Sequence, residues 1–69
     1  MNKIRYINMC IVEFGKKYGM APHISFNYLN TFGGLTFLDK CYDAEHLPSL
    51  EEAMNDLTVY CKRHGGTLG

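Results

Sequence analysis

The sequence predicts an all-α fold, a compact bundle of three to four short helices. Apolar side chains recur at spacings of three and four along most of the chain, which is the period of one helix face. Glycine, proline and capping residues divide this pattern where helices ordinarily begin and end. A chain of 69 residues is expected to form one domain, here residues 1–66, followed by a frayed tail at 67–69.

The first helix is predicted over residues 4–18. Its last turn carries lysines at positions 16 and 17, where cations suit the carbonyl end of the helix dipole. Gly19 is expected to end it. Five apolar residues share its buried face at helical spacing: Ile4, Ile7, Ile11, Phe14 and Tyr18.

The second helix is predicted to begin near Pro22, because proline fits the first helical position. Ala21, which precedes it, is a weak N-cap. The buried face is expected to comprise Ser25, Tyr28, Leu29 and Phe32.

Gly33 and Gly34 are predicted to join the second helix to a third. Gly33 would end the second helix in the left-handed conformation, which costs glycine little energy. Gly34 would then let the chain turn sharply. An extended conformation is the alternative for the third segment, because "LTFL" has mixed propensity. At helical spacing this segment carries Leu35, Leu38, Cys41 and Tyr42.

The fourth helix begins with a capping box. Ser49 is the expected N-cap and Glu52 lies three residues later, so each side chain can accept a hydrogen bond from a free backbone N–H. Lys62 and Arg63 fall in the last turn before Gly65. The expected buried stripe comprises Leu50, Ala53, Met54, Leu57, Tyr60 and Cys61.

Charge and cysteine content limit the functional classes. Seven Lys and Arg balance seven Asp and Glu, which argues against a general nucleic-acid binder, because such proteins carry a basic excess. No apolar run approaches the ~20 residues that span a bilayer, and no signal-peptide cleavage site follows the N-terminus. The three cysteines are an odd number and lie in apolar patterns. Reduced, buried thiols and a cytoplasmic location are therefore expected.

Four side chains of the types that bind zinc occur as two pairs, Cys41 with His46 and Cys61 with His64. Their spacing matches no strong zinc-finger pattern, and Cys61 belongs to the expected core. The glycines at 33 and 34 also lack the further glycines and the Lys-Ser/Thr pair of phosphate-binding loops. The sequence therefore predicts neither a metal site nor a cofactor.

Acidic residues gather near the end of the third segment, at Asp39, Asp43 and Glu45, beside His46. General acids and bases work in enclosed clefts that shift their pKa values. Four short helices leave little room for such a cleft, and this spacing is also typical of a solvated helix face. The sequence therefore predicts a protein without enzymatic activity.

Two motifs carry a resemblance to a known family. They are "F-x-YL-x-x-F-GG-x-x-FL-x-x-x-Y-x-x-EH" at residues 26–46 and "SLEEAMNDL-x-x-YCKR-x-GG" at residues 49–66. With them the chain resembles the bacterial family known as domain of unknown function 3791, over residues 4–66. The resemblance implies a small, all-helical, cytoplasmic protein. It also implies a partner, since members are often encoded beside an ADP-ribosyltransferase-like protein, in pairs that look like toxin–antitoxin modules.

From these features we predict a non-catalytic protein–protein interaction module, an antitoxin-like or accessory partner of an ADP-ribosyltransferase-like toxin. A homodimer is a further expectation. Tyr6, Met9 and Val12 on the first helix are expected to supply the interaction surface, and the alternative places them at the rim of the core. The alternative function is a small DNA-binding regulator of helix-turn-helix type, although "LTFLDKCYD" carries two Asp and one Lys.

Overall fold

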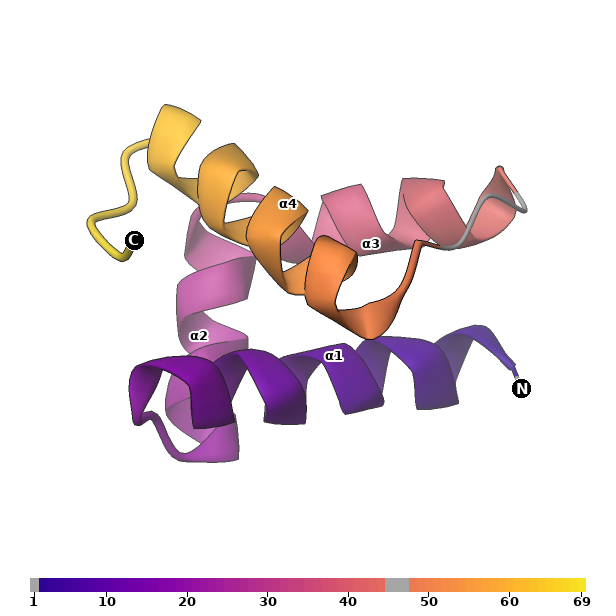
Figure 1. Ribbon diagram of the computed structural model, residues 1–69, viewed down its shortest axis with the longest axis horizontal. Helices are drawn as coiled ribbons and strands as arrows, with labels where there is room; N and C mark the ends of the chain where they lie inside the picture. Colours follow the sequence, from indigo (N-terminus) through magenta and orange to yellow (C-terminus); the bar gives the residue numbers. More distant parts are fainter. Residues whose placement is uncertain (1, 45–47) are drawn as a thin grey trace.

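Four helices follow one another along the chain, and the computed structural model describes residues 2–44 and 48–69. They are α1 (Lys3–Tyr18), α2 (Pro22–Thr31), α3 (Gly34–Asp43) and α4 (Leu50–Arg63). Helix α1 packs against each of the other three, and α1 and α4 lie in front of α2 and α3 in Figure 1. The predicted all-α bundle is confirmed over the described residues, and the third segment is helical rather than extended.

Local signals in the sequence set the helix ends. The Asn2 side chain accepts a hydrogen bond from the Arg5 amide (2.9 Å) and caps α1. Ser49 accepts one from the Glu52 amide (3.2 Å) and caps α4, as predicted. Each bond satisfies a donor that the start of a helix leaves free. Gly19 ends α1 in the left-handed conformation, with a φ of 70°.

The core is one apolar cluster to which every helix contributes. Phe14, Leu29, Leu38 and Leu57, one from each helix, are fully buried. Burying such a side chain contributes ~1.5–3 kcal/mol to the free energy of folding. These four residues are the largest of the fully buried apolar side chains. The other buried members of the cluster are Tyr6, Cys10, Ile11, Ala53, Met54 and Cys61.

The buried stripe of α1 is rotated from the predicted one. Ile4, which was expected in the core, is 72% exposed, whereas Tyr6 is buried beside Cys10, whose burial was expected. Positions 6, 10 and 14 lie along one side of the helix because they are four residues apart. Helix α3 covers that side, and the ring of its Tyr42 lies 5.6 Å from that of Tyr6. Leu50, also predicted in the core, is partly exposed because α4 begins there.

The C-terminal residues 67–69, which the sequence predicts to be a frayed tail, contact the bundle through Leu68. The Gly66 amide donates a hydrogen bond to the Cys61 carbonyl (2.8 Å) and turns the chain back after α4. The Leu68 amide then donates to the Tyr28 hydroxyl (3.2 Å), and Leu68 packs against the core. In Figure 1 the tail lies on the same side of the molecule as α2.

The Gly33–Gly34 joint connects α2 to α3 where both approach α4. Gly33 has the predicted left-handed conformation, with a φ of 79°, although α2 already ends at Thr31. A Cβ on Gly34 would lie 2.7 Å from Cδ2 of Leu29 and 3.1 Å from the sulfur of Cys61. Gly34 is therefore required for close helix packing, in addition to the turn that the sequence predicts.

Gly34→Ala should lower the free energy of unfolding by about 1–3 kcal/mol, because the added methyl group must displace Leu29 or Cys61 in a filled core. Urea denaturation followed by circular dichroism measures this change. Thr36→Ala, at an exposed position of the same helix, is the control and should change it by less than about 0.5 kcal/mol. Equal stability of the two variants would contradict the packing described at Gly34.

Candidate interaction surface

Helix α2 presents an exposed face without Lys, Arg, Asp or Glu, and the imidazole of His23 is the titratable side chain on it. All Lys, Arg, Asp and Glu residues lie in positions 3–17 or 39–63, so residues 18–38 carry none. Ile24 and Phe26 are 46% and 44% exposed, and the exposed Asn27 lies between them around the helix, since successive residues are rotated by about 100°. A neutral surface with apolar and aromatic side chains has the composition of the core of a protein–protein interface.

The inner side of α2 is fixed against α1 by small residues. The hydroxyl of Ser25, which is fully buried, donates a hydrogen bond to the Ile11 carbonyl (2.7 Å). A Cβ on Gly15 would lie 2.6 Å from the carbonyl oxygen of Met20 and 3.3 Å from Cβ of Ser25. The two backbones can approach this closely only because position 15 has no side chain. The exposed face of α2 is therefore displayed from a tightly packed support.

Aromatic rings in contact with one another provide a second support for α2. The ring of Phe14 lies 4.9 Å from Tyr18 and 5.8 Å from Tyr28, and Tyr28 lies 4.8 Å from Phe32. Such ring pairs stabilise by ~0.5–1.5 kcal/mol beyond the apolar area that they bury. The rings extend from α1 along the inner side of α2, so they add to the contact between the two helices.

The surface predicted on α1 is mostly buried. Tyr6 is only 4% exposed, and its place in the core corrects the prediction that it faces a partner. Met9 is partly buried and packs against the core. Val12 is the exposed member of the predicted set, at 37%. Tyr6 is covered because the end of α3 lies against the start of α1.

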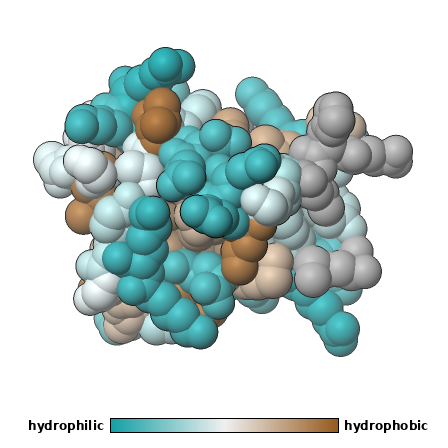
Figure 2. All heavy atoms as spheres, in the orientation of Figure 1, coloured by the Kyte–Doolittle hydropathy of each residue, from teal (hydrophilic) through white to brown (hydrophobic). Residues whose placement is uncertain are grey.

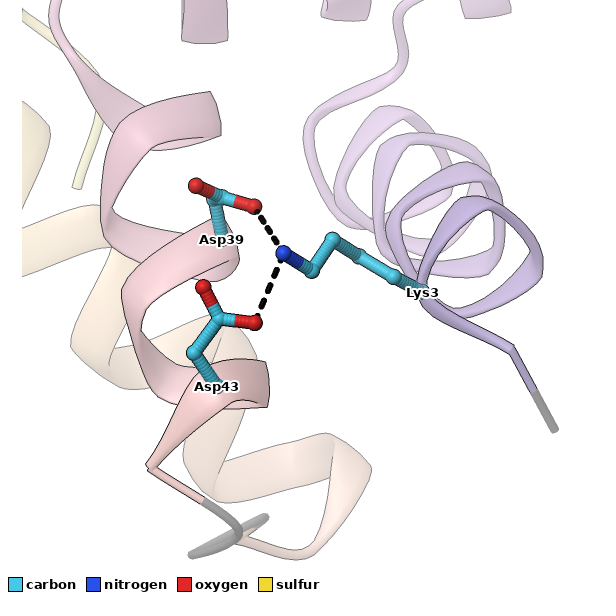
Figure 3. A network of polar contacts seen from close by, with 3 residues as sticks. All are labelled: Lys3, Asp39 and Asp43. Carbon is cyan, nitrogen blue, oxygen red and sulfur yellow. Dashed lines mark ion pairs between the residues drawn. The ribbon is translucent and has the colours of Figure 1, made fainter.

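Lys3 holds α3 against α1 through two carboxylates. Its ammonium nitrogen lies 2.7 Å from an oxygen of Asp39 and 2.7 Å from an oxygen of Asp43, which stand one turn apart on α3 (Figure 3). Hydrogen bonds to both carboxylates raise the pKa of Lys3 from 10.5 to about 12. The contribution of these ion pairs is therefore fully present below pH 10.5 and lost as the pH rises through 12.

The acidic residues near the end of α3 were considered above for acid–base chemistry. Asp39 and Asp43 bind Lys3 on an open surface, where ion pairs contribute little to stability. Glu45 and His46 lie outside the described residues. The described carboxylates are arranged to join two helices.

The candidate zinc ligands occupy different environments. Cys61 is fully buried in the core, and Cys41 is half-buried on α3. His64 is exposed beyond α4, with Nδ1 2.8 Å from the Tyr60 carbonyl oxygen. His46 lies outside the described residues. In positions 2–44 and 48–69, no three His, Cys, Asp or Glu side chains are grouped so that they could hold a metal ion.

The three thiols are protonated at neutral pH. Burial raises the pKa of Cys10, of Cys41 and of Cys61 above the ordinary value for a thiol. The thiolate, not the thiol, is the nucleophile and the metal ligand. These cysteines therefore behave as small apolar side chains.

The sequence of the whole chain now places it among known proteins. Residues 5–64 match the model of a family described as protein of unknown function (DUF3791). The chain belongs to this family. The DUF3791 match spans all four helices, and it confirms the family resemblance read from the motifs. No curated protein and no solved structure matches the chain. None of the described helices is long and apolar enough to cross a membrane.

The sequence contains a signal for the α2 surface that the prediction did not use. The interaction surface was placed on α1, because apolar residues there flank a strong core stripe. The run of residues 18–38 without charge is visible in the sequence and contrasts with the frequent charges on both sides. Together with the apolar residues at 24 and 26, it marks the helix whose exposed face differs most from an ordinary solvated surface.

Tyr6→Phe should leave the free energy of unfolding near pH 7 unchanged or raise it by up to about 1 kcal/mol. The Tyr6 hydroxyl is buried without a hydrogen-bond partner among the described residues, although the Cys10 thiol lies beside it. Burial raises the pKa of Tyr6 from 10.0 to about 12. Ionisation therefore favours the unfolded chain as the pH rises from 10 to 12, and the variant should lose less stability there.

Tyr18→Phe is the matched control. It also removes one tyrosine hydroxyl, but this hydroxyl has a hydrogen-bond partner. The hydroxyl of Thr58 donates to the Met54 carbonyl (2.9 Å), so Tyr18 donates to Thr58 (2.5 Å). Loss of this bond should cost about 0.5–1.5 kcal/mol. Urea unfolding near pH 7 and at about pH 11 compares the variants. A Tyr6→Phe protein that is less stable than the Tyr18→Phe protein at neutral pH would refute this prediction.

Proposed function

We propose that this protein is a non-catalytic protein–protein interaction module that binds its partner through the exposed face of α2. The observation that carries the proposal is the exposure of Ile24 and Phe26 on a helix without charged residues. Exposed charges must lose their water when a partner docks, at a cost in free energy. A neutral face avoids that cost and gains from the apolar area that it buries.

The partner that we propose is an ADP-ribosyltransferase-like protein, for which this chain acts as an antitoxin-like or accessory subunit. The family resemblance supports this choice, since members are often encoded beside such a protein. The chemistry of α2 supports a partner surface that is apolar and offers hydrogen bonds to Asn27 and Asn30, both exposed. We also propose a cytoplasmic location, supported by the three free cysteines.

The helix-turn-helix alternative finds less support in the residues that α3 exposes. A recognition helix presents Arg, Lys, Asn or Gln to base edges. The exposed residues of α3 include Thr36, Lys40 and Asp43, and the last of these would repel phosphate. A mobility-shift assay with the DNA upstream of the gene, repeated at several salt concentrations, distinguishes the two functions. A sequence-specific shift would favour the regulator.

Substitution of the exposed residues of α2 tests the proposed function. An ADP-ribosyltransferase-like protein, the proposed partner, should form a complex that co-purifies with the tagged chain when the two are co-expressed. Ile24→Lys and Phe26→Lys should each weaken this complex by about tenfold or more, because each forces a charge into an apolar interface. Titration calorimetry on the purified partners measures the change in Kd.

The control is Ile4→Lys, which introduces the same charge at the most exposed apolar residue of α1. It should change Kd by less than about threefold. Val12→Lys tests the surface that the sequence predicted on α1. A complex weakened by Val12→Lys and unaffected by both α2 variants would move the binding surface to α1, and the lack of any complex would overturn the proposed partner.

A further inference from the structure

Helix α4 has its charges separated by sign along its length. Its three acidic residues, Glu51, Glu52 and Asp56, all precede Val59, and its two basic residues, Lys62 and Arg63, follow it. Val59 stands near the boundary between the two signs and is 50% exposed. The outer face of α4 is turned toward the viewer in Figure 2, where hydrophilic residues surround isolated hydrophobic ones.

The helix dipole accounts for only part of this pattern. Acidic residues stabilise the first turn of a helix and basic residues the last, so the dipole explains Glu51, Glu52, Lys62 and Arg63. Asp56 lies in the middle of α4, beyond the reach of the dipole, which falls off within one turn. A half-exposed valine beside it also gains nothing from the dipole. The central residues of α4 therefore call for a different explanation.

Asp56 and Arg63 border a groove between α3 and α4. The groove has a volume of about 320 Å³, and Phe37, Val59 and Tyr60 line its apolar part. The rings of Phe37 and Tyr60 lie 4.9 Å apart. Asp56 and Arg63 are seven residues apart, so they lie on one side of the helix at about 10.5 Å along its axis. The groove thus has an apolar centre between a negative and a positive end.

This arrangement is complementary to itself. When two identical helices pack antiparallel about a two-fold axis, each end of one meets the opposite end of the other. The midpoint between positions 56 and 63 falls between Val59 and Tyr60. An axis at that point places each Asp56 opposite an Arg63 and brings the two apolar centres together. In this arrangement Asp56 does not face Asp56, and Arg63 does not face Arg63.

We propose that the outer face of α4 is a symmetric interface on which a second copy of this chain packs its own α4 antiparallel. Asp56 of each copy pairs with Arg63 of the other, and Val59, Tyr60 and Phe37 form the apolar centre. The proposed function uses α2, so this homodimer goes beyond it and depends on different residues. The α3–α4 groove and the exposed face of α2 belong to different parts of the surface, and one chain can use both.

Charge exchange tests this interface. Sedimentation equilibrium of the full chain at low salt should show a dimer. Asp56→Arg and Arg63→Asp should each raise the dimer Kd by about tenfold or more, because each places like charges opposite one another twice. The double variant, with both substitutions, restores opposite charges across the axis and should return Kd to within about threefold of the original value.

A third variant, Val59→Lys, should also weaken the dimer by about tenfold or more, because it brings two charges to the apolar centre. Ile24→Lys on α2 is the matched control and should leave the dimer Kd within about threefold. Circular dichroism verifies that each variant retains its helices, as expected for exposed positions. A monomeric wild-type chain, or a double variant as weak as the single ones, overturns the proposal.

Discussion

The close approach of Gly34 to Leu29 and Cys61 is the constraint on which the arrangement of the helices depends. At 2.7 and 3.1 Å from a hypothetical Cβ, these two neighbours leave no room for a side chain. The end of α2, the start of α3 and the last turns of α4 therefore meet at one point. The contact between Gly15 and Ser25 brings α1 to α2 in the same way. Two glycines thus allow four short helices to enclose a common core.

A chain of this length can enclose only a small core, since it buries roughly 60% of the surface that its unfolded form exposes. The exposed apolar side chains of α2 and α4 have different surroundings. Those of α2 stand on a neutral face, so binding there should respond weakly to salt. Val59 on α4 stands between opposite charges, so association there should weaken as salt screens them. The two faces are therefore suited to different partners.

Much of the fold could be predicted from local signals. The helix ends at Gly19 and Ser49 were predictable because a backbone conformation or a free N–H requires particular residue types there. Of the predicted stripe of α1, Ile11 and Phe14 are buried, whereas Ile4 is exposed. Helical spacing alone accommodates Ile4 as well as Tyr6, and the choice between them depends on where α3 lies.

The interaction surface was harder to predict from the sequence, because the exposure of residues on α1 also depends on where α3 lies. Tyr6 resembles an exposed aromatic residue in the sequence, and it is buried because α3 packs over it, with the ring of Tyr42 5.6 Å away. The contact of the tail was not predicted because the partner of Leu68, the hydroxyl of Tyr28, is forty residues away in the sequence. Long-range contacts of this kind leave no periodic pattern, whereas the lack of charge on α2 could have been noticed.

The bond between Leu68 and Tyr28 has a consequence for the motions of the molecule. Tyr28 belongs to α2, and its ring also stacks on Phe14 and packs at a tilt against Phe32. Displacement of α2 from the bundle must therefore release the C-terminal tail, and release of the tail removes one of the bonds that hold α2. The two segments are thermodynamically linked. Hydrogen exchange at the single Leu68 amide would then report how often the tail leaves Tyr28, either alone or together with α2.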